Sequence, residues 1–295
     1  MTNKERGFLL LTGHLGNPER RPLTVAQFRT LAQRAMQMDT PLESRDLQES
    51  DLVALGYDRI SAQRILVLLS EEELLDRYLY KGHRQGCLPI TRITEAYPAS
   101  VRKRLDLDAP GCLWAKGDVS LLENPAICLV GSRQLGNANR IFAETVGREV
   151  ALQGYILVSG NARGADIVAQ DACLEAGGKV ISVVADSLED YSVQKNILYL
   201  SEDAFDEAFS AQRALSRNRV IHTLGCIAIV AQCSYAKGGT WDGTVKNLQK
   251  NWSPVFCFDD GSQGAKELAH RGAKLIDIHQ LSKLSELRPD TQSFL

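Results

Sequence analysis

Residues 126–140, with the sequence AICLVGSRQLGNANR, join an apolar run to a polar turn. The apolar part, 126–130, is short and contains branched side chains, which predicts a buried β-strand. Gly131, Ser132 and Arg133 follow it directly. A glycine lets the backbone approach a ligand closely, and a guanidinium binds phosphate oxygens through two parallel hydrogen bonds. We therefore expect a phosphate-binding turn at the end of a buried strand.

The same strand pattern recurs along the chain after this turn. Apolar runs that predict strands occupy 155–160, 179–185, 196–202, 226–232, 254–260 and 273–278. Segments of helical length separate most of them, at 138–153, 164–176, 212–222 and 241–250. Strands that alternate with helices indicate a parallel sheet covered on both faces. The sequence thus predicts an α/β fold, with a Rossmann-like, mostly parallel sheet and helices on both faces, over residues 111–285.

The first 85 residues have a helical period instead. Thr24 is a suitable N-cap, and apolar residues recur on one helix face from Val25 to residue 38. Shorter helices are expected over 49–79, with a break at Gly56. We expect a small helical domain over 1–85, a linker leading into the α/β domain over 86–110, and a tail over 286–295.

Composition and charge narrow the class of protein. The 295 residues are 44% hydrophobic and 24% charged, which is typical of a globular protein. The formal net charge of −2 provides no chain-wide attraction for a polyanion, so nucleic-acid binding requires a local basic cluster. No apolar run approaches the roughly 20 residues of a membrane helix, and the N-terminus is unlike a signal peptide. A cytoplasmic location is the expectation.

The sequence predicts neither a metal site nor a cofactor. Its seven cysteines are an odd number without a C-x-x-C pair, which favours buried reduced thiols. The G-x-G-x-x-G dinucleotide fingerprint and the Walker G-x-x-x-x-G-K-[ST] motif do not occur. None of the five histidines has an evident catalytic companion in the sequence. No catalytic residue is predicted.

Four segments should meet at one edge of the sheet, because ligands of open parallel sheets bind beyond the carboxyl ends of the strands. They are GSR at 131–133, SGNARGAD at 159–166, RALSRNR at 213–219 and AKGGTWDGT at 236–244. The second and the fourth open helices, whose N-terminal amides favour an anion. Each segment alone is equally consistent with a turn or a solvated charged face, so the prediction rests on their convergence. Four arginines are expected to face one pocket: Arg133, Arg163, Arg217 and Arg219.

The order of these motifs resembles the DNA-processing protein A family (DprA, also called Smf). The resemblance is carried by YPASVRKRLDLDAPGCLWAKGDVSLLENPAICLVGSR at 97–133, LVSGNARGAD at 157–166, LYLSE at 198–202, LSRNRVIHTLG at 215–225 and GAKELAHRGAKLI at 264–276. The helical N-terminus matches, more weakly, the small SAM-like domain that the family often carries. The resemblance implies a non-catalytic protein that binds single-stranded DNA in a basic pocket, supports recombination or DNA protection, forms a homodimer, and loads the RecA recombinase during natural transformation.

The resemblance and the four segments together give a set of expected phosphate-binding residues. They are Gly131, Ser132, Arg133, Gly160, Arg163, Gly164, Asp166, Arg217, Asn218, Arg219, Gly238, Gly239 and Thr240. Trp241 has two interpretations. It is either an exposed indole that stacks on a base or the first buried residue of the next helix.

The sequence departs from the family at the expected pocket. Asn161 stands where the family has leucine, Gln170 where it has histidine, and KGGTWDGT replaces Ser-Gly-Ser-x-x-Thr-Ala. These differences leave a second interpretation open, a Rossmann-like (SLOG-type) sensor of a nucleotide ligand. A third is a nucleotide phosphoribohydrolase with a Gly-Gly-x-Gly-Thr loop. The glutamate that follows that loop is missing here, and Asp242 is the one carboxylate nearby in sequence.

Overall fold

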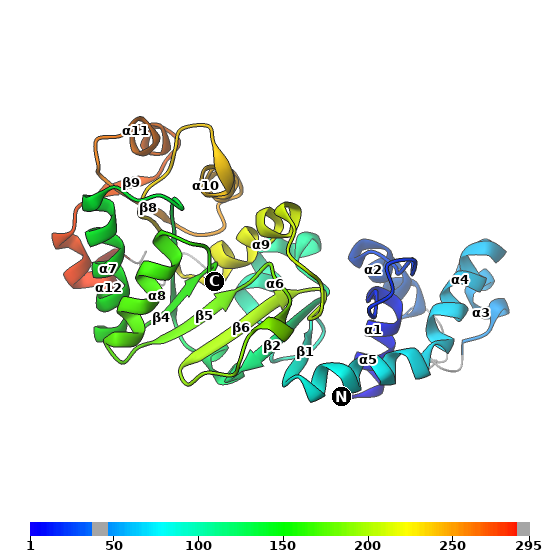
Figure 1. Cartoon of the computed structure of the whole chain (residues 1–295). Helices are drawn as coiled ribbons and strands as arrows, with labels where there is room; N and C mark the ends of the chain where they lie inside the picture. Colours follow the sequence, from blue (N-terminus) through cyan, green and yellow to red (C-terminus); the bar gives the residue numbers. More distant parts are fainter. Residues whose placement is uncertain (37–46, 288–295) are drawn as a thin grey trace.

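The computed structural model describes residues 1–36 and 47–287. The end of the helix predicted through residue 38, and the predicted tail from 288 on, lie outside these residues. A group of N-terminal helices stands beside an α/β domain (Figure 1). These helices are α1 (Asn3–Thr12), α2 (Val25–Ala35), α3 (Glu49–Ala54), α4 (Arg59–Ser70) and α5 (Glu72–Arg84). Thr24 caps α2 as predicted, since its side chain accepts a hydrogen bond from the Gln27 amide.

One sheet of nine strands runs through the described part of the chain, in the order β1-β2-β6-β5-β4-β3-β7-β8-β9. The neighbours from β6 to β9 pair in parallel, whereas β2 is antiparallel to both β1 and β6. This confirms the predicted Rossmann-like, mostly parallel sheet preceded by a helical part. The strands are β1 (Cys87–Thr91), β2 (Cys112–Gly117), β3 (Ala126–Val130), β4 (Ile156–Ser159), β5 (Lys179–Val183), β6 (Ile197–Glu202), β7 (Ile227–Val230), β8 (Val255–Phe258) and β9 (Lys274–Ile276).

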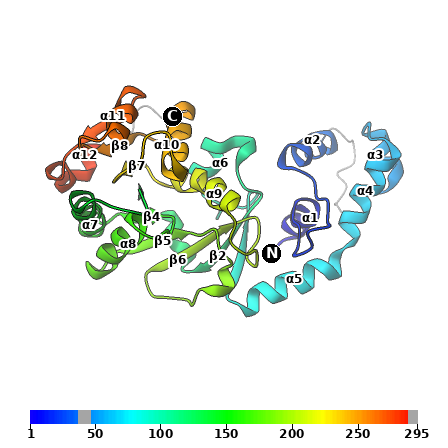
Figure 2. The same ribbon diagram turned by 45° about the horizontal axis from the view of Figure 1, so that its top comes forward.

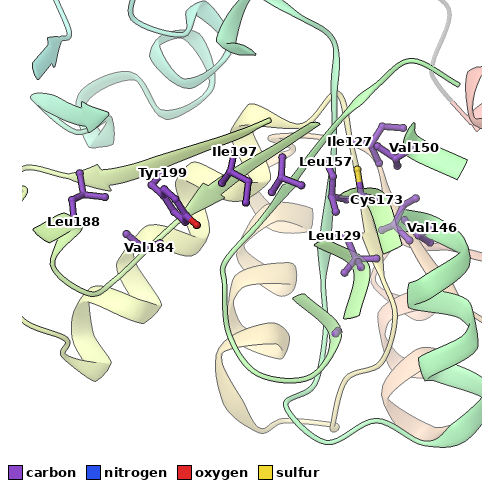
Figure 3. Packing of buried hydrophobic residues seen from close by; sticks show 14 of the residues in the cluster. Ile127, Leu129, Val146, Val150, Leu157, Cys173, Val184, Leu188, Ile197 and Tyr199 are labelled. Carbon is purple, nitrogen blue, oxygen red and sulfur yellow. The ribbon is translucent and has the colours of Figure 1, made fainter. Parts of the chain in front are cut away.

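Helices cover both faces of the sheet (Figure 2). One face carries α7 (Asn137–Leu152) and α8 (Ala165–Glu175), and the other carries α6 (Ala99–Leu105), α9 (Ala211–Leu224), α10 (Gly238–Lys250) and α11 (Gln263–His270); α12 (Leu284–Leu287) ends the described chain. Alternate side chains of β3 point to opposite faces. Ile127 and Leu129 pack with Val146 of α7, as Figure 3 shows, whereas Cys128 and Val130 join the core under α9. Burial on both faces explains why β3 is apolar throughout.

The strand order reverses at β3. The chain passes from β3 outward through β4 and β5 to β6, and α9 then returns it to β7 on the other side of β3. Such a reversal leaves a crevice beyond the carboxyl ends of the two central strands. The turn after β3 and the loop after β7 both open into this crevice.

The N-terminal helices have a small core of their own and are fastened to the sheet by α5. Leu52 and Ile65 lie in that separate core, whereas Tyr78 of α5 packs edge-on against Trp114 of β2 with ring centroids 5.4 Å apart. Tyr78 Oη donates a hydrogen bond to Asp206 Oδ1 at 2.7 Å, and Lys81 Nζ lies 2.8 Å from Asp206 Oδ2. The segment after β6 is therefore tied to α5.

The segment 86–110, predicted as a linker, contains β1 and α6. Pro89 obscures the strand in the sequence, because proline cannot donate to a β-ladder and is confined to edge strands. β1 is such an edge strand, with β2 as its one neighbour.

Six of the seven cysteines are buried and Cys226 is half-buried, in line with the expectation of reduced core thiols. No helix within the described residues is both long and apolar enough to cross a bilayer.

Candidate phosphate-binding site

A cavity of about 560 Å³ opens where the strand order reverses, between the turn after β3, the loop after β4, helix α9 and the start of α10. Its lining includes most of the residues expected to bind phosphate. These are Gly131, Ser132, Arg133, Asp166, Arg217, Asn218, Gly238, Gly239 and Thr240. A volume of this size is typical of a site for a nucleotide-sized ligand. The predicted convergence of separate segments is thus observed for these nine positions.

Hydrogen bonds between the segments hold the rim of the cavity in place. Thr240 Oγ1 donates to the carbonyl of Gly131 at 2.8 Å, which joins the start of α10 to the turn after β3. Asn218 Nδ2 donates to the carbonyl of Gly239 at 3.1 Å, which joins α9 to α10. The side chains of Thr240 and Asn218 are therefore positioning groups. The first amides of α10, like those of any α-helix, have no intrahelical acceptors. Those amides point their partial positive charge at the cavity.

The turn after β4 approaches α9 and the β3 turn closely. A Cβ atom on Gly160 would lie 1.4 Å from Arg217 Nη1, so only glycine leaves room for this guanidinium. Gly164 has φ of +89° at the start of α8, and a Cβ there would lie 2.4 Å from the carbonyl oxygen of Ser132. The next amide, of Ala165, donates to that same carbonyl at 3.1 Å. The start of α8 therefore holds the β3 turn with an amide that was expected to bind an anion.

Arg217 is the buried cation of the cavity. Its exposed fraction is 7%, and its Nε atom is buried with no hydrogen-bond acceptor among the described residues. Burial lowers the pKa of Arg217, while the carboxylates of Asp166 and Asp186 act in the opposite direction. A guanidinium remains protonated even so, and a buried charge without a bonded partner costs several kcal/mol. The site is thus built to receive an anion at Arg217.

Asp166 moderates this charge without neutralising it. It is 6% exposed and accepts a hydrogen bond from the Ala162 amide at 3.1 Å. Burial raises the pKa of Asp166, whereas the Arg217 charge and the Ala162 amide lower it. No salt bridge joins Asp166 to Arg217, so the guanidinium keeps its hydrogen-bonding capacity for a ligand.

The other expected arginines do not line this cavity. Arg219 Nη2 forms a salt bridge with Glu202 Oε2 at 2.8 Å, and Arg219 Nη1 donates to Ser216 Oγ at 2.7 Å. Arg219 lines a second cavity of about 750 Å³ on the adjoining flank of α9, where Leu215 and Asn218 line both cavities. Arg163 is exposed and lies outside the lining. The prediction that four arginines face one pocket is therefore wrong for these two. Arg219 is turned away because residues 217 and 219 are separated by about 200° around a helix, and Arg163 lies on the exposed loop between β4 and α8.

Trp241 is a buried residue at the start of α10 and not an exposed indole. It is 7% exposed, and its ring meets that of Tyr235 edge-on at 5.1 Å while the guanidinium of Arg271 lies 5.5 Å from its centroid. It faces the second cavity and the core under α9, so the ring is unavailable for stacking in the first cavity.

Several lining residues were missed from the sequence. Lys237 is an exposed cation at the start of α10, and Phe209 is 55% exposed at the mouth of the cavity. On α9, the lining residues Ala211, Leu215 and His222 repeat at helical spacing with Asn218. That spacing is the signal that could have identified them, since every third or fourth residue of a helix shares a face.

Comparison with known proteins identifies the family of this chain. The family model for DNA recombination-mediator protein A matches residues 89–286. The chain belongs to this family. The DNA processing protein DprA of Streptococcus pneumoniae is 32% identical over 190 residues, which are 59% of this chain and 66% of that relative. The matched segment thus spans slightly less than two thirds of the relative's length.

Solved structures of two family members share the fold. The structure of DNA processing protein A from Streptococcus pneumoniae has a TM-score of 0.70 and 24% identity, and the match covers 97% of this chain and 98% of that one. DNA processing protein A from Helicobacter pylori, solved to describe its single-stranded DNA binding mode, has a TM-score of 0.57 and 25% identity. That match covers 69% of this chain and 97% of the other.

Two departures from the DNA recombination-mediator family lie behind the cavity, outside its lining. Asn161 has φ of +58°, and its Nδ2 donates to Tyr191 Oη at 3.1 Å. Gln170 Nε2 donates to Ser159 Oγ at 2.7 Å inside the core. Gln170 thereby satisfies a buried hydroxyl, whereas the bond between Asn161 and Tyr191 is half-buried. The third departure, at 237–244, supplies Lys237 and the glycines that line the cavity.

Proposed function

We propose that this protein binds single-stranded DNA through its phosphates at the cavity beneath Arg217, without catalysis, in DNA recombination or DNA protection. Family membership supports a role in recombination. The observation that supports this ligand is the buried guanidinium of Arg217, whose Nε has no acceptor among residues 1–36 and 47–287 and which lines an open cavity. A phosphate oxygen supplies the missing acceptor and the missing negative charge.

The remaining lining suits a phosphate backbone. Arg133, Lys237 and the amides at the start of α10 surround the same space as Arg217. Contacts of this kind position a nucleic acid without distinguishing its bases. Binding is therefore expected to tolerate any sequence and to weaken with salt.

The same geometry supports binding without hydrolysis. Asp166 is the carboxylate in the lining, and its oxygen is engaged by the Ala162 amide beside a guanidinium. Asp242, the carboxylate nearest the glycine-rich loop, lines the second cavity instead. A phosphoribohydrolase needs a free carboxylate at the ribose carbon.

The expected phosphate contacts form part of this proposal. We assign them to Gly131, Ser132, Arg133, Arg217, Gly238 and Gly239, with Gly160, Gly164, Asp166, Asn218 and Thr240 in support. A homodimer, contact with RecA and a cytoplasmic location are proposed from the family alone. Sedimentation and a RecA pull-down test the first two.

The volume of the cavity also suits a single nucleotide, so the experiment must separate polymer from monomer. Fluorescence anisotropy with labelled oligo-dT at low salt should show saturable binding, and a mononucleotide should compete weakly. Binding of the mononucleotide with no binding of oligo-dT would replace the proposal by a nucleotide sensor. Mass spectrometry of ligands released from the denatured protein gives an independent answer.

A further inference from the structure

One face of α9 leads from the mouth of the cavity to its closed end. Ala211, Leu215, Asn218 and His222 repeat every three or four residues, and all four line the cavity. Burial increases along this row: Leu215 is 50% exposed, Asn218 is half-buried, and His222 is 1% exposed. His222 therefore lies at the closed end.

The hydrogen bonds around His222 determine which ring nitrogen carries the proton. The amide of Ser253 donates to Asn247 Oδ1 at 2.9 Å, which fixes the orientation of the Asn247 side chain. Asn247 Nδ2 then faces Ser253 Oγ at 3.0 Å and His222 Nδ1 at 3.1 Å. An amide nitrogen only donates, so Nδ1 of His222 accepts. The neutral ring carries its proton on Nε2.

Burial agrees with this protonation state, since it lowers the pKa of His222 to about 4. Nε2 forms no hydrogen bond with another described residue, and it is not among the fully enclosed side-chain nitrogens that lack a partner, which agrees with the place of His222 in the lining of the cavity. Gly243 of α10 has no side chain to cover this nitrogen, since a Cβ atom there would lie 3.4 Å from Nε2.

We propose that His222 Nε2 donates a hydrogen bond to a phosphate oxygen of DNA bound in the cavity. The proposal rests on the proposed function and adds a neutral donor to its cations. The chemistry of the lining favours a phosphate oxygen, since Arg133, Arg217 and the first amides of α10 concentrate positive charge in the same space.

A neutral donor has a distinct signature in solution. The salt dependence of DNA binding counts the phosphates neutralised by cations, because each releases counterions. His222 therefore contributes to affinity without contributing to the salt slope. Arg133 and Arg217 contribute to both.

The test compares two substitutions, each of which retains the hydrogen-bonding group of one imidazole nitrogen and removes the other. His222→Asn retains an acceptor near Nδ1 for Asn247 and removes the Nε2 donor. His222→Gln reaches the Nε2 position with an amide nitrogen and removes the Nδ1 acceptor. We expect His222→Asn to weaken binding of oligo-dT about tenfold, in keeping with one hydrogen bond to a charged group. His222→Gln should bind more tightly than His222→Asn although it melts at a lower temperature, and both should keep the wild-type salt slope.

NMR provides a readout that a merely structural role would not move. The Nε2 and Hε2 resonances of His222 should shift when oligo-dT is titrated, while Nδ1 keeps its acceptor shift. The inference fails if His222→Asn binds like the wild type, if His222→Gln is the weaker binder, or if Nε2 is unchanged by DNA. Wild-type protein that does not bind oligo-dT at all overturns the proposed function and this inference together.

Discussion

Arg217 and Arg219 lie two residues apart on α9 and have opposite surroundings. Arg219 points to one side of the helix, where Glu202 and Ser216 accept its hydrogen bonds. Arg217 points to the other side, where it is buried against Gly160 and forms no ion pair or side-chain hydrogen bond with another described residue, although the Nε atoms of both arginines lack an acceptor. Arg219 is held by bonds within the fold, and Arg217 is the one of the two that we propose binds a ligand. A cluster of like charges in sequence therefore contains two kinds of residue, which their partners distinguish.

The largest effect expected is on DNA affinity when each arginine is removed in turn. Arg217→Ala should weaken oligo-dT binding about 10- to 100-fold, since it removes charged hydrogen bonds worth roughly 1.5–3 kcal/mol. Its melting temperature should be unchanged or higher, because a buried charge without a bonded partner is removed. Arg219→Ala should leave affinity within about twofold and lower the free energy of unfolding by roughly 1–3 kcal/mol, since Glu202 loses its partner.

Anisotropy titrations measure the DNA affinity of these two variants and thermal melts measure their stability, and we expect each variant to change mainly one of the two. Equal losses of affinity in both would mean that the two sides of α9 do not differ in function. A large loss of stability in Arg217→Ala would assign that arginine to the fold as well.

Displacing the Arg217 side chain by a change at a neighbouring residue should weaken oligo-dT binding nearly as much as Arg217→Ala. Gly160→Ala places a methyl group where the guanidinium lies, so the side chain must move out of the cavity. We expect about a tenfold loss of oligo-dT affinity. In the double variant Gly160→Ala/Arg217→Ala the loss should match that of Arg217→Ala alone, because both changes act on one group. Additive losses would show that Gly160 contributes by another route.

A smaller effect separates charged from neutral contacts at the cavity. Arg133→Ala should flatten the log–log salt slope by about 0.7, the value for one single-strand phosphate, and weaken all sequences alike. His222→Asn should leave that slope unaltered. The measurement is the affinity for oligo-dT over a series of salt concentrations, and an unaltered slope in Arg133→Ala would remove this arginine from the phosphate contacts.

The smallest effect concerns stability and pH. The folded protein holds the pKa of His222 at about 4, below its ordinary 6.5, so the unfolded chain gains a proton first as the pH falls. Stability from this group is complete above pH 6.5 and decreases toward pH 4, by about 2 kcal/mol at pH 5. Relative to His222→Gln, which does not titrate, the wild type should lose this amount between pH 7 and 5. The prediction is contradicted if the wild type and His222→Gln lose the same free energy of unfolding between pH 7 and pH 5, as measured by chemical denaturation.

The sequence predicted the scaffold better than the site. The apolar runs of β3 to β9 and the glycine turns after them identified a parallel sheet and its binding edge. The edge strand β1 was not predicted, because its apolar run is short and contains Pro89, and proline is rare in strands. Arg219 was assigned to the pocket because a motif records order along the chain and not direction around a helix.

The role proposed for His222 could not be predicted from the sequence, because it also depends on how residues are arranged in space. Its protonation depends on Asn247 and Ser253, which are 25 and 31 residues further along the chain, and only folding brings them together. Trp241 was ambiguous because an aromatic residue at the start of a helix has the same pattern whether it is buried or exposed.

The attachment of α5 to the sheet limits how this protein can be divided. Trp114 is 1% exposed because α5 lies over it, and a Cβ atom on Gly82 would already come within 2.9 Å of the indole. A fragment that begins after α5 would expose this ring and Phe205 to water and would release Asp206 from Tyr78 and Lys81. Phe209, at the mouth of the cavity, follows Asp206 by three residues. Truncation aimed at isolating the α/β domain would therefore expose an aromatic surface to water and loosen the segment at the mouth of the cavity.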